Sequence, residues 1–424
     1  LPSLIVARVI QAFGGGAVTP TGMSMVMEVF PSKERGKALG LWGVAIITGP
    51  AIGPTLGGYL TNDFGWRSIF LVNLPVGIIG VFLAIKTLMK DHIHRISKKP
   101  FDFWGFAFFS IFLVTFLLGM SKGEREGWTS VYILSCFVIS GLTFIGFLLV
   151  ESHVANPIID LSLFGIPIFS IAIVITIVRS IGLFGSTFLI PLFVQQQLGY
   201  TTIQCGLLML PSAVFMALIL PSVGRMSDKI GPRVPSIIGL LLMAHSLIAY
   251  RTLDLHTDAW TLILPMMERS VGLALLLAPI NTTLMNAVPP YKIGMASSMN
   301  NILMQVGASI GIAFFGTSLS HRAIYHLSEV SQAISPDNVS FASTAHEFSR
   351  HVHTLGYSYA QSLTITKSVL VGRVFQAAMV MSYQDAFIIG GVVVLLAVPL
   401  AFLLPVKPVH HHRKEADSPL VGME

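Results

Sequence analysis

Charged residues are scarce in this sequence of 424 residues. Asp, Glu, Lys and Arg together make up 11% of the chain, whereas soluble domains carry about 25%. Hydrophobic residues make up 53%, which excludes a soluble globular protein and indicates a polytopic membrane protein. The formal net charge of +6 is therefore interpreted loop by loop as a guide to membrane orientation, and it does not indicate nucleic-acid binding.

Cysteine is also rare, and no group of catalytic residues stands out. The two cysteines, Cys136 and Cys205, lie in or beside apolar segments, so no disulfide framework or metal cluster is indicated. An intramembrane enzyme would need His, Asp or Glu side chains gathered at one depth, and we find none. We therefore expect no enzymatic activity, no metal and no cofactor. The chain has no signal peptide and starts at Leu1 inside an apolar segment, so we expect residues to precede it.

Apolar segments of about 20 residues predict the membrane spans. The eleven segments are Leu4–Phe30, Ala38–Leu60, Ile69–Leu88, Trp104–Met120, Val131–Val150, Ile168–Val194, Gly206–Val223, Val234–Tyr250, Trp260–Val288, Met295–Leu319 and Ala386–Leu404. When the spans alternate, the Lys- and Arg-rich loops fall on one side, except for the mildly acidic loop Glu151–Gly165. The positive-inside rule makes that side cytoplasmic, which places residue 1 outside and the C-terminus in the cytoplasm.

The segment from His321 to about Gln384 is the one long loop, and it is predicted to be extracytoplasmic. Its helix-like pieces HRAIYHLSEVSQAI and TKSVLVGRVFQAAMVM predict two amphipathic helical extensions around a polar middle. The loop also carries five histidines, but their spacing is irregular. A metal site is therefore disfavoured relative to solvated side chains.

The stretch Gly40–Tyr59, GLWGVAIITGPAIGPTLGGY, carries glycines and prolines that would disrupt a soluble helix. Gly49, Gly53 and Gly57 recur every four residues and so share one helix face, which a neighbouring helix could approach closely. The prolines bend the helix. We expect this face to pack partly on the C-terminal bundle, so that Gly53→Leu would block closure more than folding.

Several polar residues lie inside predicted spans, where charge is costly. Arg8 has Gln11 one turn away, and we expect this pair to face the bundle interior, although Arg8 could also reach the membrane surface. The segment that begins at Arg8 shares an Arg, an apolar run and a proline with the segment that begins at Arg269, which suggests related halves. A cavity role or a local structural role is open for four further residues, Arg179, Glu268, Arg269 and Asn281.

Two more sites lie near span ends. Asp228, in a turn with Gly231 and Arg233, can accept hydrogen bonds from helix-end amides. It would anchor the loop or hold one of two bundle arrangements, and both roles predict poor tolerance of Asp228→Asn. Asp102 is expected to cap its helix. For Asn300, Asn301 and Gln305, hydrogen bonding between helices is favoured over substrate contact.

Several motifs of this sequence resemble those of the major facilitator superfamily, in particular of its 14-span drug:proton antiporters of the EmrB/QacA type. GPAIGPTLGG (Gly49–Gly58) resembles the fifth-span antiporter motif, and ARVIQAFGGGA (residues 7–17) resembles the fourth-span motif, with Ala12 in place of Gly. GRMSDKIGPR (Gly224–Arg233) is similar to the cytoplasmic loop motif, and FDFWG (Phe101–Gly105) to the acidic motif of the seventh span. The long loop and YQDAF are similar to the EmrB branch. The motif positions carried over are Gly49, Pro50, Gly53, Pro54, Gly57 and Gly58; Gly224, Asp228, Lys229, Gly231 and Arg233; and Asp102 and Gly105.

The resemblance implies an all-α major facilitator fold that lacks its first three spans, one of which usually holds an acidic coupling residue. It divides the chain into the rest of an N-terminal bundle (1–90), a linker with two extra spans (91–166), a C-terminal six-span bundle (167–405) with a long loop (320–384), and a cytoplasmic tail (406–424). We expect no transport from these residues alone.

The resemblance also implies a function. It predicts multidrug efflux across the bacterial cytoplasmic membrane, with a proton gradient as the energy source and Arg8 involved in proton coupling. Lipophilic, often cationic compounds are the implied substrates, and amphipathic anions fit the basic residues of the spans. A periplasmic membrane-fusion adaptor and an outer-membrane channel are the implied partners. The alternative within the same fold is a symporter or facilitator for a nutrient or siderophore.

Overall fold

The computed structural model describes residues 2–31, 34–87, 102–154, 157–333 and 339–407. The α-helices are α1 (Pro2–Val29), α2 (Arg35–Phe64), α3 (Ser68–Leu71), α4 (Asn73–Thr87), α5 (Phe103–Glu126), α6 (Val131–Glu151), α7 (Pro167–Gln196), α8 (Thr202–Ile230), α9 (Arg233–Ala249), α10 (Ala259–Asn286), α11 (Ile293–Ala333), α12 (Val339–Thr354), α13 (Tyr359–Leu395) and α14 (Val398–Ala401). Short 3-10 turns are η1 (Leu161–Gly165), η2 (Tyr250–Thr252) and η3 (Pro290–Lys292). No strand occurs in these ranges, so the all-α prediction is confirmed.

Nine helical stretches in the described part of the chain are long and apolar enough to cross a membrane. They correspond to the third to eleventh expected spans. The first two expected spans form α1 and α2, helices of 28 and 30 residues. At 1.5 Å per residue both are longer than the roughly 30 Å hydrocarbon core of a bilayer.

Helices α7 to α11 and α13 share one continuous core. Helix α10 is the most enclosed of them, because α7, α8 and α9 all pack on it. Helices α7 and α11 approach backbone to backbone at Gly307 and Gly311, where an added β-carbon would lie 2.9 Å from the Ile177 carbonyl oxygen and 2.6 Å from that of Ile181. Small residues permit such close packing inside membranes.

Helix α2 packs on the C-terminal bundle, and its main partner is α8. The two run antiparallel, because Gly36 lies beside Asp228 near the end of α8 whereas Gly58 lies beside Ile203 near its start. The backbones also approach closely at Gly40, where a β-carbon would lie 2.9 Å from the Leu220 carbonyl oxygen. The predicted contact with the C-terminal bundle therefore exists.

The glycines that make this contact are not the predicted ones. A β-carbon on Gly49, Gly53 or Gly57 would meet nothing within 4 Å. Gly53, Gly57 and Gly58 instead line a cavity of about 520 Å³ beside the start of α8. The packing face consists of Gly36, Gly40 and Gly43, nearly four turns earlier. The expected packing of the Gly49–Gly57 face is therefore wrong for this arrangement, because a β-carbon there enters open space, while the effect of Gly53→Leu on closure stays a prediction.

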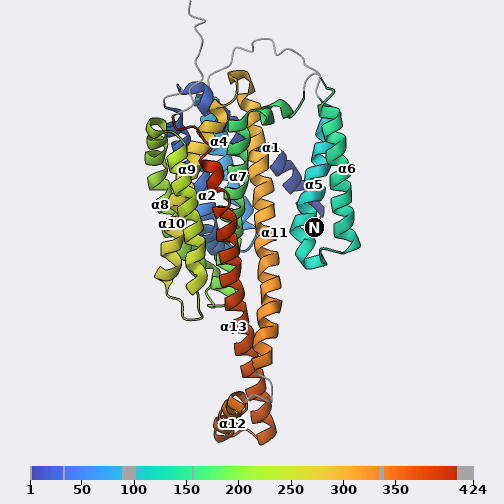
Figure 1. Cartoon of the computed structure of the whole chain (residues 1–424), viewed down its shortest axis with the longest axis vertical. Coiled ribbons are helices and arrows are strands. Elements are labelled where there is room, and N and C mark those ends of the chain that lie inside the picture. Colours follow the sequence, from blue (N-terminus) through green and yellow to red (C-terminus); the bar gives the residue numbers. More distant parts are fainter. Residues whose placement is uncertain (1, 32–33, 88–101, 155–156, 334–338, 408–424) are drawn as a thin grey trace, which may run out of the picture.

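The linker helices α5 and α6 form a separate pair that lies beside α11 (Figure 1). Their contact is largely aromatic: the ring centroids of Phe109 and Phe147 are 4.8 Å apart, and those of Phe112 and Phe144 are 4.7 Å apart. Phe and other large apolar residues of this pair also point outward. That outward face suits a lipid environment.

Helices α11 and α13 continue beyond the other helices and form a stalk, with α12 at its far end (Figure 1). They contain 41 and 37 residues, about 62 and 56 Å at 1.5 Å per residue. The long segment thus extends both helices, as the sequence predicts, and the part between the extensions contains a further helix, α12. At the stalk base, Asp385 pairs with Arg322 and His326. Among the described residues no group of three or more His, Cys, Asp or Glu side chains could hold a metal ion.

The two glycine sets of α2 predict opposite effects of the same substitution. Gly40→Ala should lower the free energy of unfolding by about 1–3 kcal/mol, because the methyl group collides with backbone that cannot move aside. Gly53→Ala should leave it unchanged or raise it, because alanine stabilises a helix interior by roughly 0.5–1 kcal/mol. Melting temperatures of the two purified variants decide the question. Equal losses at both positions would contradict the packing face described here.

Candidate functional site

The loop motif joins the end of α8 to the first turn of α2. Asp228 Oδ1 accepts the backbone N–H of Gly36 at 3.0 Å, and Oδ2 accepts that of Lys37 at 3.1 Å. First-turn amides have no partner within their own helix, and the helix dipole favours an anion there. The predicted hydrogen bonds from helix-end amides to Asp228 are therefore confirmed, and the amides belong to α2.

The other residues of the motif shape this contact between the end of α8 and the first turn of α2, which we call the joint. Gly224 lies against Gly36 so closely that a β-carbon on Gly36 would be 2.6 Å from the Gly224 carbonyl oxygen. Gly231 has φ of +79°, a conformation that favours glycine. Arg233 Nε donates to the Leu404 carbonyl oxygen at 2.6 Å, whereas Lys229 is exposed. The motif thus binds α2 on one side and the segment after α14 on the other.

Arg35 extends the joint to α10, an interaction that the sequence analysis missed. Its Nη1 donates to Asn286 Oδ1 at 2.7 Å, and its Nε donates to the Phe30 carbonyl oxygen at 3.3 Å. The only signal in the sequence is the basic loop that contains Arg35. Together with Asp228, this hydrogen bond closes one end of the interface between α2 and the C-terminal bundle.

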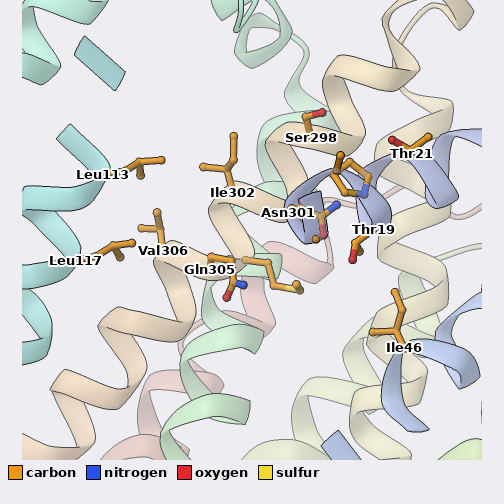
Figure 2. Close-up of a pocket in the computed structure, with 15 residues that line it drawn as sticks. Thr19, Thr21, Ile46, Leu113, Leu117, Ser298, Asn301, Ile302, Gln305 and Val306 are labelled. Atoms are coloured by element: carbon orange, nitrogen blue, oxygen red, sulfur yellow. The ribbon is translucent and has the colours of Figure 1, made fainter. Parts of the chain in front are cut away.

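A cavity of about 730 Å³ lies between α1, α5 and α11. Figure 2 shows Thr19 of α1 facing Asn301 and Gln305 of α11, with Leu113 and Leu117 of α5 on the opposite side. Ser297 Oγ donates to the Pro20 carbonyl oxygen at 3.0 Å and ties α11 to α1 beside the cavity. The lining combines hydroxyl and amide groups with aliphatic side chains, and none of the described residues in it is charged.

Most of this lining was not predicted from the sequence. Thr19, Thr21 and Ser298 were not candidates, and Asn301 and Gln305 were expected to bond between helices. Asn301 does donate to the Ser297 carbonyl oxygen at 2.9 Å, but within its own helix. The usable signal was the four-residue spacing of the two amides, which places them on one helix face.

The predicted coupling residues do not gather in this cavity. Arg8 Nη1 donates to Gln11 Oε1 at 2.8 Å, and its guanidinium lies 4.6 Å from the centre of the Phe70 ring. Both residues are exposed, on a half of α1 that the described helices leave uncovered. Their proximity fits the expected pair, but their exposure does not fit the expected position in the bundle interior, and their role in coupling stays a prediction.

Three other candidates are buried inside the C-terminal bundle. Arg269 donates to the Ser186 hydroxyl of α7. Arg179 is 2% exposed, and Arg179 Nη1 and Asn281 Oδ1 have no hydrogen-bond partner among the described residues. These side chains are buried within their own bundle and do not line the 730 Å³ cavity. Their role in a central cavity between the two bundles stays a prediction.

Glu268 points in a different direction from its neighbour Arg269. It lies at the outer surface, where α9 and α10 are in contact. Its Oε1 is 2.7 Å from His245 Nδ1. The surrounding exposed residues, such as Leu241 and Leu264, are apolar. Successive residues on a helix point about 100° apart, which explains why Arg269 is buried while Glu268 reaches the outer surface.

In the linker, Asp102 Oδ1 accepts the backbone N–H of Gly105 at 2.8 Å. The predicted helix cap is therefore confirmed, at the start of α5.

Comparisons with known proteins agree with this architecture. Residues 1–312 match the profile described as Major Facilitator Superfamily. The chain is 31% identical over 389 residues to the uncharacterized MFS-type transporter YhcA of Bacillus subtilis, which is 91% of this chain and 72% of that protein. It is 26% identical over 412 residues to the fatty acid resistance protein FarB of Neisseria gonorrhoeae (97% and 79%). It is 27% identical over 390 residues to the colistin resistance protein EmrB of Acinetobacter baumannii (91% and 75%).

The joint at Asp228 predicts which substitutions matter. Asp228→Asn removes the charge and one of two acceptors, and should lower the free energy of unfolding by about 1–3 kcal/mol. Lys37→Ala should change it by less than about 0.5 kcal/mol, because the backbone N–H remains. Thermal unfolding of both variants tests this difference. A comparable loss in Lys37→Ala would show that the contact is an ion pair between side chains.

Proposed function

The chain belongs to the major facilitator superfamily, and on this basis we propose that it exports amphipathic small molecules across the bacterial cytoplasmic membrane in exchange for protons. The family consists of transporters and not of enzymes. The observation that carries the proposal is the interface between α2 and α8, which is tightly closed at one end and open at the other.

The asymmetry of this interface supports alternating access. Gly36, Gly40 and Asp228 bring α2 into contact with α8 at the loop-motif end, whereas Gly53 and Gly57 face an open cavity toward the other end. The basic loops predict that the motif end is cytoplasmic. In that orientation the protein is closed toward the cytoplasm, which is the arrangement a releasing exporter adopts. Breaking the Asp228 contacts would begin the return.

The cavity favours substrates that combine apolar surface with a few hydrogen-bonding groups. Leu113, Leu117 and Ile302 offer aliphatic contacts, and Asn301 and Gln305 offer amides. Pockets of this volume and composition suit drug-sized ligands. FarB is named for fatty acid resistance and EmrB for colistin resistance, so these two relatives are named for resistance to different compounds. Nothing in the lining is specific for one charge.

Proton coupling is proposed to use titratable and charged groups within the spans rather than a bound cofactor. Glu268 with His245 is a titratable pair at the outer surface, and Arg8, Arg179 and Arg269 are positive charges that can respond to a nearby proton.

The stalk supports the proposed extracytoplasmic adaptor. Helices α11 and α13 are about twice as long as a bilayer core requires, so the stalk projects well beyond the membrane. Its surface carries exposed apolar side chains, including Ile324, Val371 and Phe375. Such a surface suits helix-to-helix docking with an adaptor of the membrane-fusion type, which would pass substrates to an outer-membrane channel.

Transport can be tested with the complete protein in liposomes under a pH gradient. An amphipathic drug should elicit proton movement, and Asn301→Ala or Gln305→Ala should raise the drug KM by roughly 3- to 10-fold, the effect of one lost hydrogen bond. Gln196→Ala, an exposed amide at the end of α7, is the matched control. Equilibrative flux of a nutrient without drug-dependent proton movement would support the alternative function instead.

The adaptor can be tested separately by co-purification from cells that express both proteins. Ile324→Arg and Val371→Glu should abolish co-purification of a membrane-fusion adaptor, because a charge is placed at the apolar contact. Proton movement in liposomes should remain at the wild-type level in both variants. Tyr291→Arg, at an exposed position near the opposite end of α11, should have no effect. Retention of the adaptor by both stalk variants would place its docking site elsewhere.

A further inference from the structure

The linker helices α5 and α6 bring two carboxyl groups to the same edge of the protein. Asp102 lies directly before α5, and Glu151 is the last residue of α6. One oxygen of each accepts a backbone N–H: Asp102 Oδ1 that of Gly105, and Glu151 Oε1 that of Ile159. Backbone donors therefore hold both side chains in place.

The second oxygen of each carboxyl group has no donor. Asp102 Oδ2 and Glu151 Oε2 are buried and accept no hydrogen bond in the described structure, and the two residues are 8% and 5% exposed. The two oxygens face each other across Gly105, because both lie within 3 Å of the position that a β-carbon of Gly105 would occupy. Gly105 leaves the space between them, because a β-carbon there would collide with Asp102 Oδ2 and lie 2.9 Å from Glu151 Oε2.

Two ionised carboxylates would be costly in this position. Like charges about 4 Å apart repel by about 4 kcal/mol at an effective dielectric constant of 20, and each buried oxygen without a donor costs about 1–3 kcal/mol. A single proton removes both costs, because the protonated carboxyl donates a short, charge-assisted hydrogen bond to the ionised one. Neighbouring aspartates share a proton for the same reason in aspartic proteases.

No cation among the described residues is placed to neutralise the pair instead. His153 is exposed and turns back to its own helix, with Nδ1 2.8 Å from the Leu149 carbonyl oxygen. Lys292 binds Asp160. Burial raises the pKa of Asp160, but hydrogen bonds from Lys292 and Ser162 outweigh it and leave this pKa below its ordinary value. The basic residues of segment 90–99 lie outside the described residues.

We propose that Asp102 and Glu151 hold one proton between them and form a protonation-dependent latch. Glu151 also holds Ile159, and the next residue, Asp160, is bound to Lys292 just before α11. The latch therefore connects the linker helices to the helix that lines the cavity. Loss of the proton leaves two repelling charges and loosens this connection. The latch does not depend on the identity of any transported substrate.

Infrared spectroscopy of the purified protein tests the shared proton directly. At neutral pH the wild type should show the carbonyl stretch of one protonated carboxylic acid. Both Asp102→Asn and Glu151→Gln should lose this band, because the amide that replaces either partner donates the hydrogen bond and leaves the other carboxyl ionised. Asp258→Asn is the matched control, since Asp258 caps α10 through Trp260 N–H and has no carboxyl partner there.

Each infrared outcome decides the proposal. Loss of the band in only one of the two variants would identify a single protonated acid and overturn sharing. Absence of the band in the wild type would overturn the proposal even if a variant failed to fold.

The pH dependence of unfolding gives a second, independent readout. Exposed carboxyls of the unfolded chain release their protons near pH 4, whereas the folded pair keeps one. The free energy of unfolding contributed by the pair is therefore greatest near that pH and falls as the pH rises further, until the pair is deprotonated. Melting temperature should decline with pH in the wild type, and this decline should be smaller in both amide variants. An unchanged slope in both variants would contradict the latch.

Discussion

The contact between the first turn of α2 and the last turns of α8 determines the arrangement of the two halves. Gly36 and Gly224 have no side chains, so the backbones meet directly, and Asp228 accepts the helix-end amides that this approach would otherwise leave unpaired. Because α2 follows α1 and α8 belongs to the C-terminal bundle, this contact also limits how far α1 can move from α11. The width of the cavity between α1 and α11 thus depends on it.

The same contact is suited to being broken. Glycine faces bury little apolar surface, and the hydrophobic contribution scales with the area buried, at about 25 cal/mol per Å². Val44 of α2 packs against the cluster of Leu220 and Val223, and the closure adds hydrogen bonds and the charge at the helix terminus, each of which contributes about 1 kcal/mol. Water can replace these interactions when the halves separate. An interface held by large aliphatic side chains would expose far more apolar surface on opening.

The sequence was sufficient for interactions within one helix or at its end, and insufficient for contacts between distant helices. Apolar runs located the spans, and the amide-accepting roles of Asp102 and Asp228 follow from carboxylates placed beside a helix start or in a turn. The packing glycine was misassigned, because Gly40 and Gly53 belong to sets with similar spacing and only the position of α8 distinguishes them. Likewise, Asn300 turns toward Thr176 of α7 while its neighbour Asn301 lines the cavity, a choice that depends on how α11 packs.

Helix α11 connects all the features described above. Near its start Lys292 binds Asp160 next to the linker, its middle lines the cavity with Asn301 and Gln305, and its far part forms the stalk (Figure 1). Gly307 and Gly311 fix it against the backbone of α7, so α11 cannot shift without the bundle that contains α7. A displacement at the linker is therefore transmitted as movement of a rigid helix pair, and the cavity wall and the stalk base move together because they belong to the same continuous helix.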